Sequence, residues 1–171
     1  MKTYQEFMQE SSLSRIKSKS DKGGMAIISG SRGDKSSKEN KARAKQLDRD
    51  IKGKGLPGAT KVTGSYVEKG DDGKEKRVKE RSHVVTSGKK GKRAFKKAVK
   101  SLGKKYGQDS VLTQTKKTGT LSATRKGGLG KKPKNKRPLG STKRVGLGKF
   151  KPQGKNPEGQ SQIKGKTFTY G

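Results

Sequence analysis

The chain has 171 residues, and its 46 Lys and Arg against 14 Asp and Glu give a formal net charge of +32 at pH 7. Leu, Ile, Val and Phe make up about 15% of the residues, so any hydrophobic core is thin and parts of the chain are expected to be disordered. The lack of Cys and the presence of a single histidine, His83, exclude a disulfide framework, a thiolate metal site and a histidine cluster. No apolar run is long enough for a membrane span or a secretory signal.

Shifts in composition divide the chain into a head at residues 1–20, a middle at residues 21–124 and a tail at residues 125–171. The middle holds most of the periodic apolar residues, whereas the head and the tail are largely polar. We therefore expect one small folded domain with an extension at each end.

The head begins with ten residues that can form a short helix. Thr3 and Glu6 have the spacing of a capping box. Three apolar side chains then share one helical face, namely Tyr4, Phe7 and Met8. So short a helix is unstable alone, and we expect it to fold against a partner. The next ten residues are rich in Ser and Lys without periodicity, which is typical of a flexible linker.

The first half of the middle region is predicted to contain a strand, a helix and a hairpin. The expected order is a buried strand at 25–28, a helix capped by Ser37 and ending at Gly53, a strand at 59–67, a loop at 70–73 and a strand containing Val84 and Val85. The helix is indicated by apolar residues at helical spacing, and the loop by a charged cluster bounded by glycines.

The second half of the middle region is predicted to contain a helix at 91–106, a strand at 110–113 and a shorter strand around Leu121. The helix repeats apolar residues on one face while Lys residues cover the other. The element order β-α-β-β-α-β is that of the ferredoxin-like split βαβ sandwich, in which two helices cover one face of an antiparallel sheet. The predicted fold class is therefore α+β, and a different α+β arrangement of the same elements is the alternative.

The tail carries 14 Lys and Arg against the single acid Glu158, and it contains four of the five prolines. This composition predicts disorder in the free protein. A loose repeat relates residues 128–133 to residues 146–152, which is typical of a flexible arm that follows a phosphate backbone without reading bases. A solvated linker is the alternative interpretation.

The net charge of +32 causes strong self-repulsion unless a polyanion neutralises it. We expect the tail to bind double-stranded DNA of any sequence. The residues expected to make these contacts are Lys131, Lys132, Lys134, Lys136, Arg137, Lys143, Arg144, Lys149 and Lys151. One alternative partner is an anionic membrane surface, for which the basic segments lack an apolar face. Another alternative is a charge that serves solubility alone.

The first ten residues, Met1-Lys2-Thr3-Tyr4-Gln5-Glu6-Phe7-Met8-Gln9-Glu10, resemble the capsid-targeting sequence of internal head proteins of T-even-like tailed phages. The resemblance implies that the prohead scaffold docks Tyr4, Phe7 and Met8. It also implies that the prohead protease cleaves between Glu10 and Ser11 after recognising Met8-Gln9-Glu10. The family usually has Ile or Leu, and then a small residue, where this chain has Met8 and Gln9.

The middle region resembles a small uncharacterised domain family of bacteria and phages over roughly residues 25–114. The matching segments are Ala26-Ile27-Ile28-Ser29, Arg32-Gly33, Glu39-Asn40, Arg43, Leu47 and Tyr106-Gly107-Gln108-Asp109-Ser110-Val111-Leu112. The resemblance implies one domain and carries no known activity.

The sequence offers no constellation of catalytic residues, because its acids are scattered among Lys and Arg. His83 is expected to be a satisfied or exposed strand residue, and Asp71-Asp72 a turn rather than a metal site. The motifs Gly128-x-Gly130 and Gly146-x-Gly148 do not complete a phosphate-binding loop. The protein is therefore predicted not to be an enzyme and to need no cofactor or metal. The polar residues to inspect for a site are Ser29, Arg32, Asn40 and Gln108.

Two functions remain open. The main hypothesis is an internal head protein that is processed by the prohead protease, packaged with the genome inside the phage head and present in the host cytoplasm beforehand. The alternative is an injected effector that inhibits a host nuclease or another defence enzyme.

Overall fold

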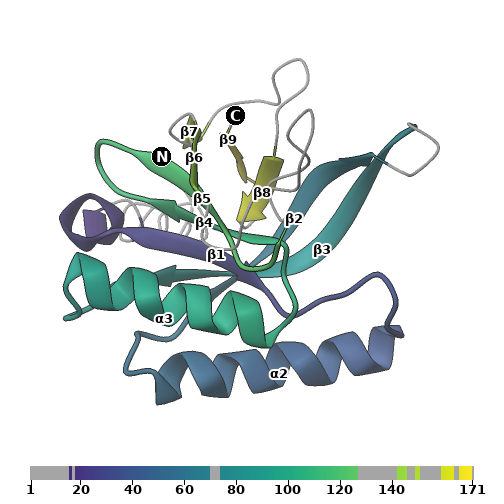
Figure 1. The fold of residues 1–171 in the computed structure, drawn as a ribbon, viewed down its shortest axis with the longest axis horizontal. Helices are drawn as coiled ribbons and strands as arrows, with labels where there is room; N and C mark the ends of the chain where they lie inside the picture. The colour runs from purple at the N-terminus through teal and green to yellow at the C-terminus, as the bar shows by residue number, and fades with distance from the viewer. Residues whose placement is uncertain are drawn as a thin grey trace, which may run out of the picture.

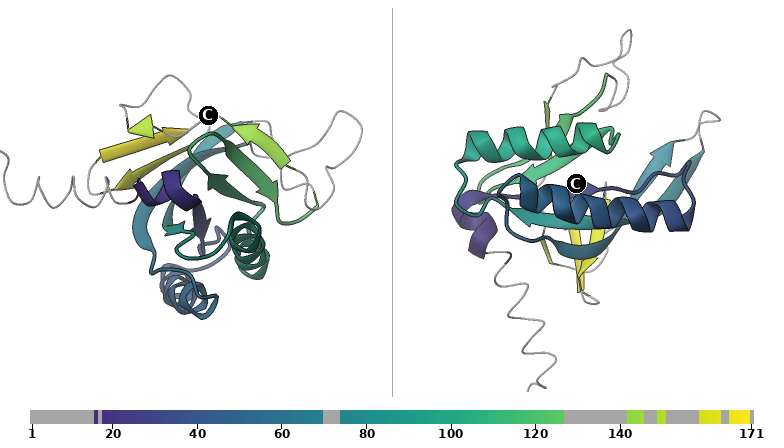
Figure 2. Two further views of the ribbon diagram at one scale, coloured as in Figure 1. Left: turned by 90° about the vertical axis from the view of Figure 1, so that its left-hand side faces the viewer. Right: turned by 90° about the horizontal axis from the view of Figure 1, so that it is seen from below.

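The computed structural model describes residue 16 and residues 18–69, 74–126, 142–145, 149–150, 159–163 and 166–170 (Figure 1). The fold is α+β, with two long helices packed on one face of an antiparallel sheet (Figures 1 and 2). Among these residues no helix is long and apolar enough to cross a membrane.

The elements follow the predicted order through residue 123. They are β1 (Met25–Ser29), α2 (Ser37–Gly53), β2 (Thr60–Lys69), β3 (Glu75–Thr86), α3 (Lys92–Lys105), β4 (Ser110–Gln114) and β5 (Gly119–Ala123). Four of the strands lie in the order β4-β1-β3-β2, and every neighbouring pair is antiparallel. The predicted ferredoxin-like sandwich is confirmed, with β5 added beside β4.

The structure assigns four further strands beyond residue 125. They are β6 (Thr142–Val145), β7 (Lys149–Phe150), β8 (Gly159–Ile163) and β9 (Lys166–Tyr170). β6 pairs with β5 and β8 pairs with β2, so the full sheet has the order β6-β5-β4-β1-β3-β2-β8-β9-β7. This differs from the disordered tail predicted from composition, because backbone hydrogen bonds to an open sheet edge need few apolar side chains. The domain boundaries themselves stay predictions.

α2 is held by strong terminal signals. The Ser36 side chain accepts a hydrogen bond from the Glu39 N–H, and the Glu39 carboxylate accepts one from the Ser36 N–H. The cap is thus one residue earlier than the predicted Ser37. Leu47 and Ile51 are buried against the sheet, as their spacing predicts.

α3 buries its predicted apolar face but has a weaker start. Phe95, Val99 and Leu102 are buried, and Gly91 at the N-cap offers no side-chain hydrogen bond. Gly103 is a buried residue near the end of α3. A Cβ atom built there would overlap the Val111 side chain and lie 3.0 Å from Thr124 Cγ2, so glycine allows α3 to approach the sheet closely.

Two apolar clusters lie on opposite faces of the sheet. The first is sandwiched between the sheet and the helices and includes Ile28, Leu47, Val85, Phe95 and Leu102. The second lies on the other face, where a helical segment at residues 18–23 packs, and contains Ile16, Met25, Ile27, Val62, Val84 and Leu112. Figure 2 shows the sheet curling away from α2 and α3 around this second face. Both faces of the central strands are therefore covered.

Candidate functional site

The side chains predicted to dock scaffold, protease and DNA are not placed by the structure. Tyr4, Phe7, Met8, Gln9, Glu10 and Ser11 lie outside the described residues, as do Lys131, Lys132, Lys134, Lys136, Arg137 and Lys151. Lys143 and Arg144 belong to β6, and Lys149 belongs to β7. Their predicted roles stay predictions.

Three of the four polar residues singled out in the sequence lie at the loop between β1 and α2 and have structural partners. The Ser29 hydroxyl donates to the Arg81 carbonyl oxygen over 2.8 Å. The Arg32 N–H donates to Asn40 Oδ1 over 3.0 Å, and Asn40 Nδ2 donates back to the Arg32 carbonyl oxygen over 3.0 Å. The Arg32 guanidinium also donates to the Gly107 carbonyl oxygen over 3.2 Å. These contacts join this part of the chain to β3 through Ser29, to α2 through Asn40 and to the end of α3 through Arg32.

Gln108, the fourth of these residues, follows the end of α3. Its Oε1 atom is buried and has no hydrogen-bond partner among the described residues. The Gln108 carbonyl oxygen accepts a hydrogen bond from the Thr124 hydroxyl. We assign this residue to the turn that joins α3 to β4.

A second polar network joins α2 to the end of α3. Arg43 donates through Nε to the Gly30 carbonyl oxygen (2.6 Å) and through a terminal nitrogen to the Tyr106 carbonyl oxygen (2.7 Å). The Tyr106 hydroxyl donates to Asp50 over 2.7 Å, and Lys105 Nζ lies 2.7 Å from the same carboxylate. The pairs with Lys105 and Tyr106 lower the pKa of Asp50, and burial raises the pKa of Tyr106. Asp50 and Tyr106 are therefore held in their charged and neutral forms, respectively, by packing partners.

His83 lies in β3 as predicted, but it is buried at 1% exposure. Its Nε2 atom is 3.1 Å from Asp48 Oδ1, and Lys61 Nζ is 3.0 Å from Asp48 Oδ2. Neither ring nitrogen has a partner with hydrogen-bond geometry among the described residues. Burial is the largest influence and lowers the pKa of His83, Lys61 lowers it further, and Asp48 opposes both. His83 is therefore neutral at pH 7. The expectation of a satisfied or exposed strand residue is wrong, because the ring is buried by the packing of the sheet and its nitrogens have no such partner among the described residues.

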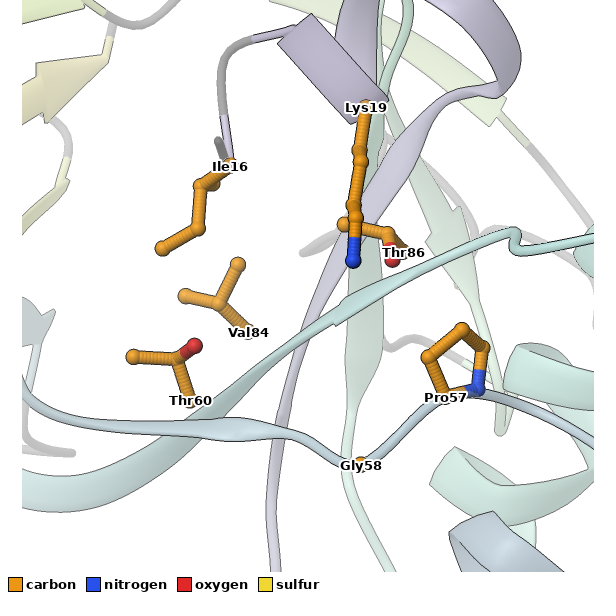
Figure 3. Close-up of a pocket in the computed structure, with 7 residues that line it drawn as sticks. All are labelled: Ile16, Lys19, Pro57, Gly58, Thr60, Val84 and Thr86. Atoms are coloured by element: carbon orange, nitrogen blue, oxygen red, sulfur yellow. The ribbon is translucent and has the colours of Figure 1, made fainter. Parts of the chain in front are cut away.

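A cavity of about 170 Å³ lies on the face of the sheet away from α2 and α3 (Figure 3). It is lined by Ile16, Lys19, Pro57, Gly58, Thr60, Val84 and Thr86. In Figure 3 the Lys19 side chain reaches from the helical segment toward Thr86, while Thr60 and Val84 form the floor. The cavity combines an ammonium group and two hydroxyls with an apolar wall, a pattern suited to a small ligand with one anionic end.

Sequence reasoning missed this cavity because its residues come from three separate segments. Lys19 precedes β1, Pro57 lies before β2, Thr60 begins β2, and Thr86 ends β3. The Thr60↔Val84 register, which brings two of the lining residues together, is set by pairing between strands.

The described residues contain no group of three or more metal-ligating side chains. Asp71 and Asp72 lie outside these residues, as do Gly128, Gly130, Gly146 and Gly148.

No curated protein matches this chain significantly. The sequence model of the S-adenosylmethionine lyase family matches residues 26–170, which is most of the chain and includes β6–β9. This finding overturns the prediction that the protein is not an enzyme, which relied on the lack of acid–base constellations in the sequence. It also extends the resemblance noted for residues 25–114 through the C-terminal strands, and it gives no support to a head protein. The chain belongs to the S-adenosylmethionine lyase family.

Proposed function

We propose that this protein breaks a carbon–sulfur bond of S-adenosylmethionine without water or a methyl acceptor. The observation that carries the proposal is the family match over residues 26–170. That match spans the whole βαββαβ domain and the strands added to both of its edges.

The substrate carries its own leaving group, because a sulfonium sulfur departs as a neutral thioether. When the bond from sulfur to the γ-carbon of the methionine part breaks, the electron pair goes to sulfur and leaves methylthioadenosine. The remaining fragment is completed in one of two ways. Its own carboxylate oxygen attacks the γ-carbon to close a lactone, or the neighbouring carbon loses a proton to form an alkene. The first route needs no protein base, so it is compatible with the cavity.

We place the methionine end of the substrate in the cavity. The Lys19 ammonium and the hydroxyls of Thr60 and Thr86 would hold its carboxylate by charge-assisted hydrogen bonds. The apolar side chains of Ile16 and Val84 would contact the methylene groups. The cavity is smaller than the roughly 300 Å³ of a typical whole-ligand site, so the adenosine part would extend beyond it.

This activity favours the injected effector over the internal head protein as the role of the chain. An enzyme that destroys S-adenosylmethionine would deprive every host enzyme that uses this methyl donor of its substrate, including methylating defence enzymes. The effector would then work by removing a small molecule rather than by blocking a nuclease directly. Packaging by DNA binding is a compatible means of delivery.

The test is turnover of S-adenosylmethionine by the purified full chain, followed by chromatography and mass spectrometry. Lys19→Ala is expected to raise KM about tenfold, because the bound substrate loses the charge-assisted hydrogen bond to its carboxylate. Lys22→Ala is the matched control, since Lys22 is exposed on the same helical segment and does not line the cavity. Equal KM values for the two variants would show that the substrate does not bind in this cavity. A wild-type chain that does not convert S-adenosylmethionine would refute the proposed activity.

A further inference from the structure

The outer face of α3 carries many positive charges and no negative charge. The helix carries seven basic residues and no acid over 14 residues. They are Lys92, Arg93, Lys96, Lys97, Lys100, Lys104 and Lys105. All are exposed except Lys100, which is half-buried, and the apolar residues of the helix face the sheet. The array runs along the whole length of the helix, which is about 21 Å at 1.5 Å per residue.

The described residues do little to compensate this charge. Lys105 is paired with Asp50, and no other cation of α3 has a carboxylate oxygen within 4.0 Å among the described residues. Lys92 and Arg93 lie in the first turn, where the helix dipole repels cations, and that turn holds no acid. In the free protein these cations therefore repel one another and the helix dipole. A bound anion would reduce this repulsion.

The chemistry of this face selects among polyanions. The helix turns Phe95, Val99 and Leu102 into the core, so it has no exposed large apolar side chain to insert into a membrane interface. It also lacks exposed aromatic residues, which anchor protein interfaces and stack on single-stranded bases. A duplex backbone, with about one negative charge per 1.7 Å of axis, needs only such a row of cations.

We infer that the outer face of α3 docks on the phosphate backbone of double-stranded DNA, independently of sequence. This assigns DNA binding to the folded domain, on the side of the sheet opposite the cavity, and not to the tail alone. The inference does not depend on the proposed lyase activity, because the two sites lie on opposite faces of the central sheet.

The experiment compares three full-length variants that each lose four positive charges. The α3 variant carries Lys92→Gln, Arg93→Gln, Lys96→Gln and Lys97→Gln. The α2 control carries Lys38→Gln, Lys41→Gln, Lys45→Gln and Lys52→Gln, all exposed in the structure. The tail variant carries Lys131→Gln, Lys132→Gln, Lys134→Gln and Lys136→Gln. Binding to a fluorescent duplex of arbitrary sequence is measured by anisotropy over a range of salt concentrations.

The α3 variant should flatten the plot of log K against log salt by about 3 to 4 units, at roughly 0.9 for each lost contact. Its Kd at low salt should rise at least about tenfold above that of the α2 control. Its melting temperature should not fall, because Lys92 and Arg93 oppose the helix dipole and Lys96 and Lys97 are exposed. A loss of binding without a loss of stability separates a docking surface from a folding defect.

Three results would overturn the inference. Equal losses in all three variants would show that only net charge matters, and a dominant loss in the tail variant would assign the contacts to the tail. Tighter binding of the wild-type chain to vesicles of anionic lipid or to single-stranded DNA than to the duplex would assign α3 a different partner. Because the readout is DNA affinity, an inactive lyase would leave the result unaffected.

Discussion

The two helices of the domain share one core but differ on their outer sides. α2 begins with a reciprocal capping box, has Glu39 in its first turn and carries six basic residues against three acids. α3 begins at an uncapped glycine, has no acid at all and places two cations against its own dipole. α2 is therefore built for stability by its own sequence. α3 relies on burial of its apolar face, and its outer side is better explained by a ligand than by folding.

The largest difference is expected for one glycine in each helix. Gly103→Ala should destabilise the protein by about 1–3 kcal/mol, because the added carbon would overlap Val111. Gly53→Ala should stabilise it by about 0.5–1 kcal/mol, because nothing lies within 4 Å of that position and alanine is the better helix former. Urea denaturation of both variants gives the two changes in unfolding free energy. A stabilised Gly103→Ala would show that α3 does not need its close approach to β4.

The next effect concerns the two N-caps. Ser36→Ala should cost about 1 kcal/mol, because the Glu39 N–H loses the Ser36 hydroxyl as its acceptor. Gly91→Ser should add a few tenths of a kcal/mol to α3, since the backbone at this position is extended and the space around it is open. Thermal unfolding followed by circular dichroism measures both. If adding the serine destabilised the protein, the start of α3 would be constrained by something other than its missing cap.

The smallest expected effect is a change in how the free energy of unfolding depends on pH, caused by the Asp50 contact between the two helices. The pKa of Asp50 is lowered first by Lys105 and then by Tyr106, so its folded pKa lies below the unfolded value near 3.8. Its contribution to stability is thus complete above about pH 4 and is lost as pH falls through the lower, folded pKa. Asp50→Asn should make the acid limb of the stability curve shallower. An unchanged acid limb would mean that this ion pair does not couple the helices.

The sequence predicts the helices and the central strands because the apolar residues of each recur at the spacing that places them on its buried face. Leu47 and Ile51 on α2, and Phe95, Val99 and Leu102 on α3, face the sheet as their spacing requires. The cap was placed one residue late because Ser36 and Ser37 are the same residue type, although only Ser36 stands three residues before Glu39.

β8 and β9 were missed for a different reason. Their position depends on the open edge of β2, which is a property of the assembled sheet rather than of residues 159–170. The alternation of Thr and aromatic residues in Thr167-Phe168-Thr169-Tyr170 is the local signal that could have identified β9.

The enzyme was missed because the proposed reaction needs no acid–base pair. We searched for paired carboxylates, a nucleophile with a base or a metal cluster. Such a search does not detect an enzyme whose substrate supplies its own leaving group. The cavity could not be predicted either, because Lys19, Thr60 and Thr86 are common residue types far apart in the chain. Only the pairing of β2 with β3 and the helical segment at 18–23 bring them together.

The most direct test of the account follows the methyl group of S-adenosylmethionine by proton NMR in the presence of the purified chain and no methyl acceptor. A lyase moves this resonance from the sulfonium to the thioether position while the methyl and adenosyl groups stay on sulfur, and we predict catalytic conversion to methylthioadenosine. S-adenosylmethionine that stays intact with a folded, DNA-binding sample would contradict the assignment of lyase activity to this chain.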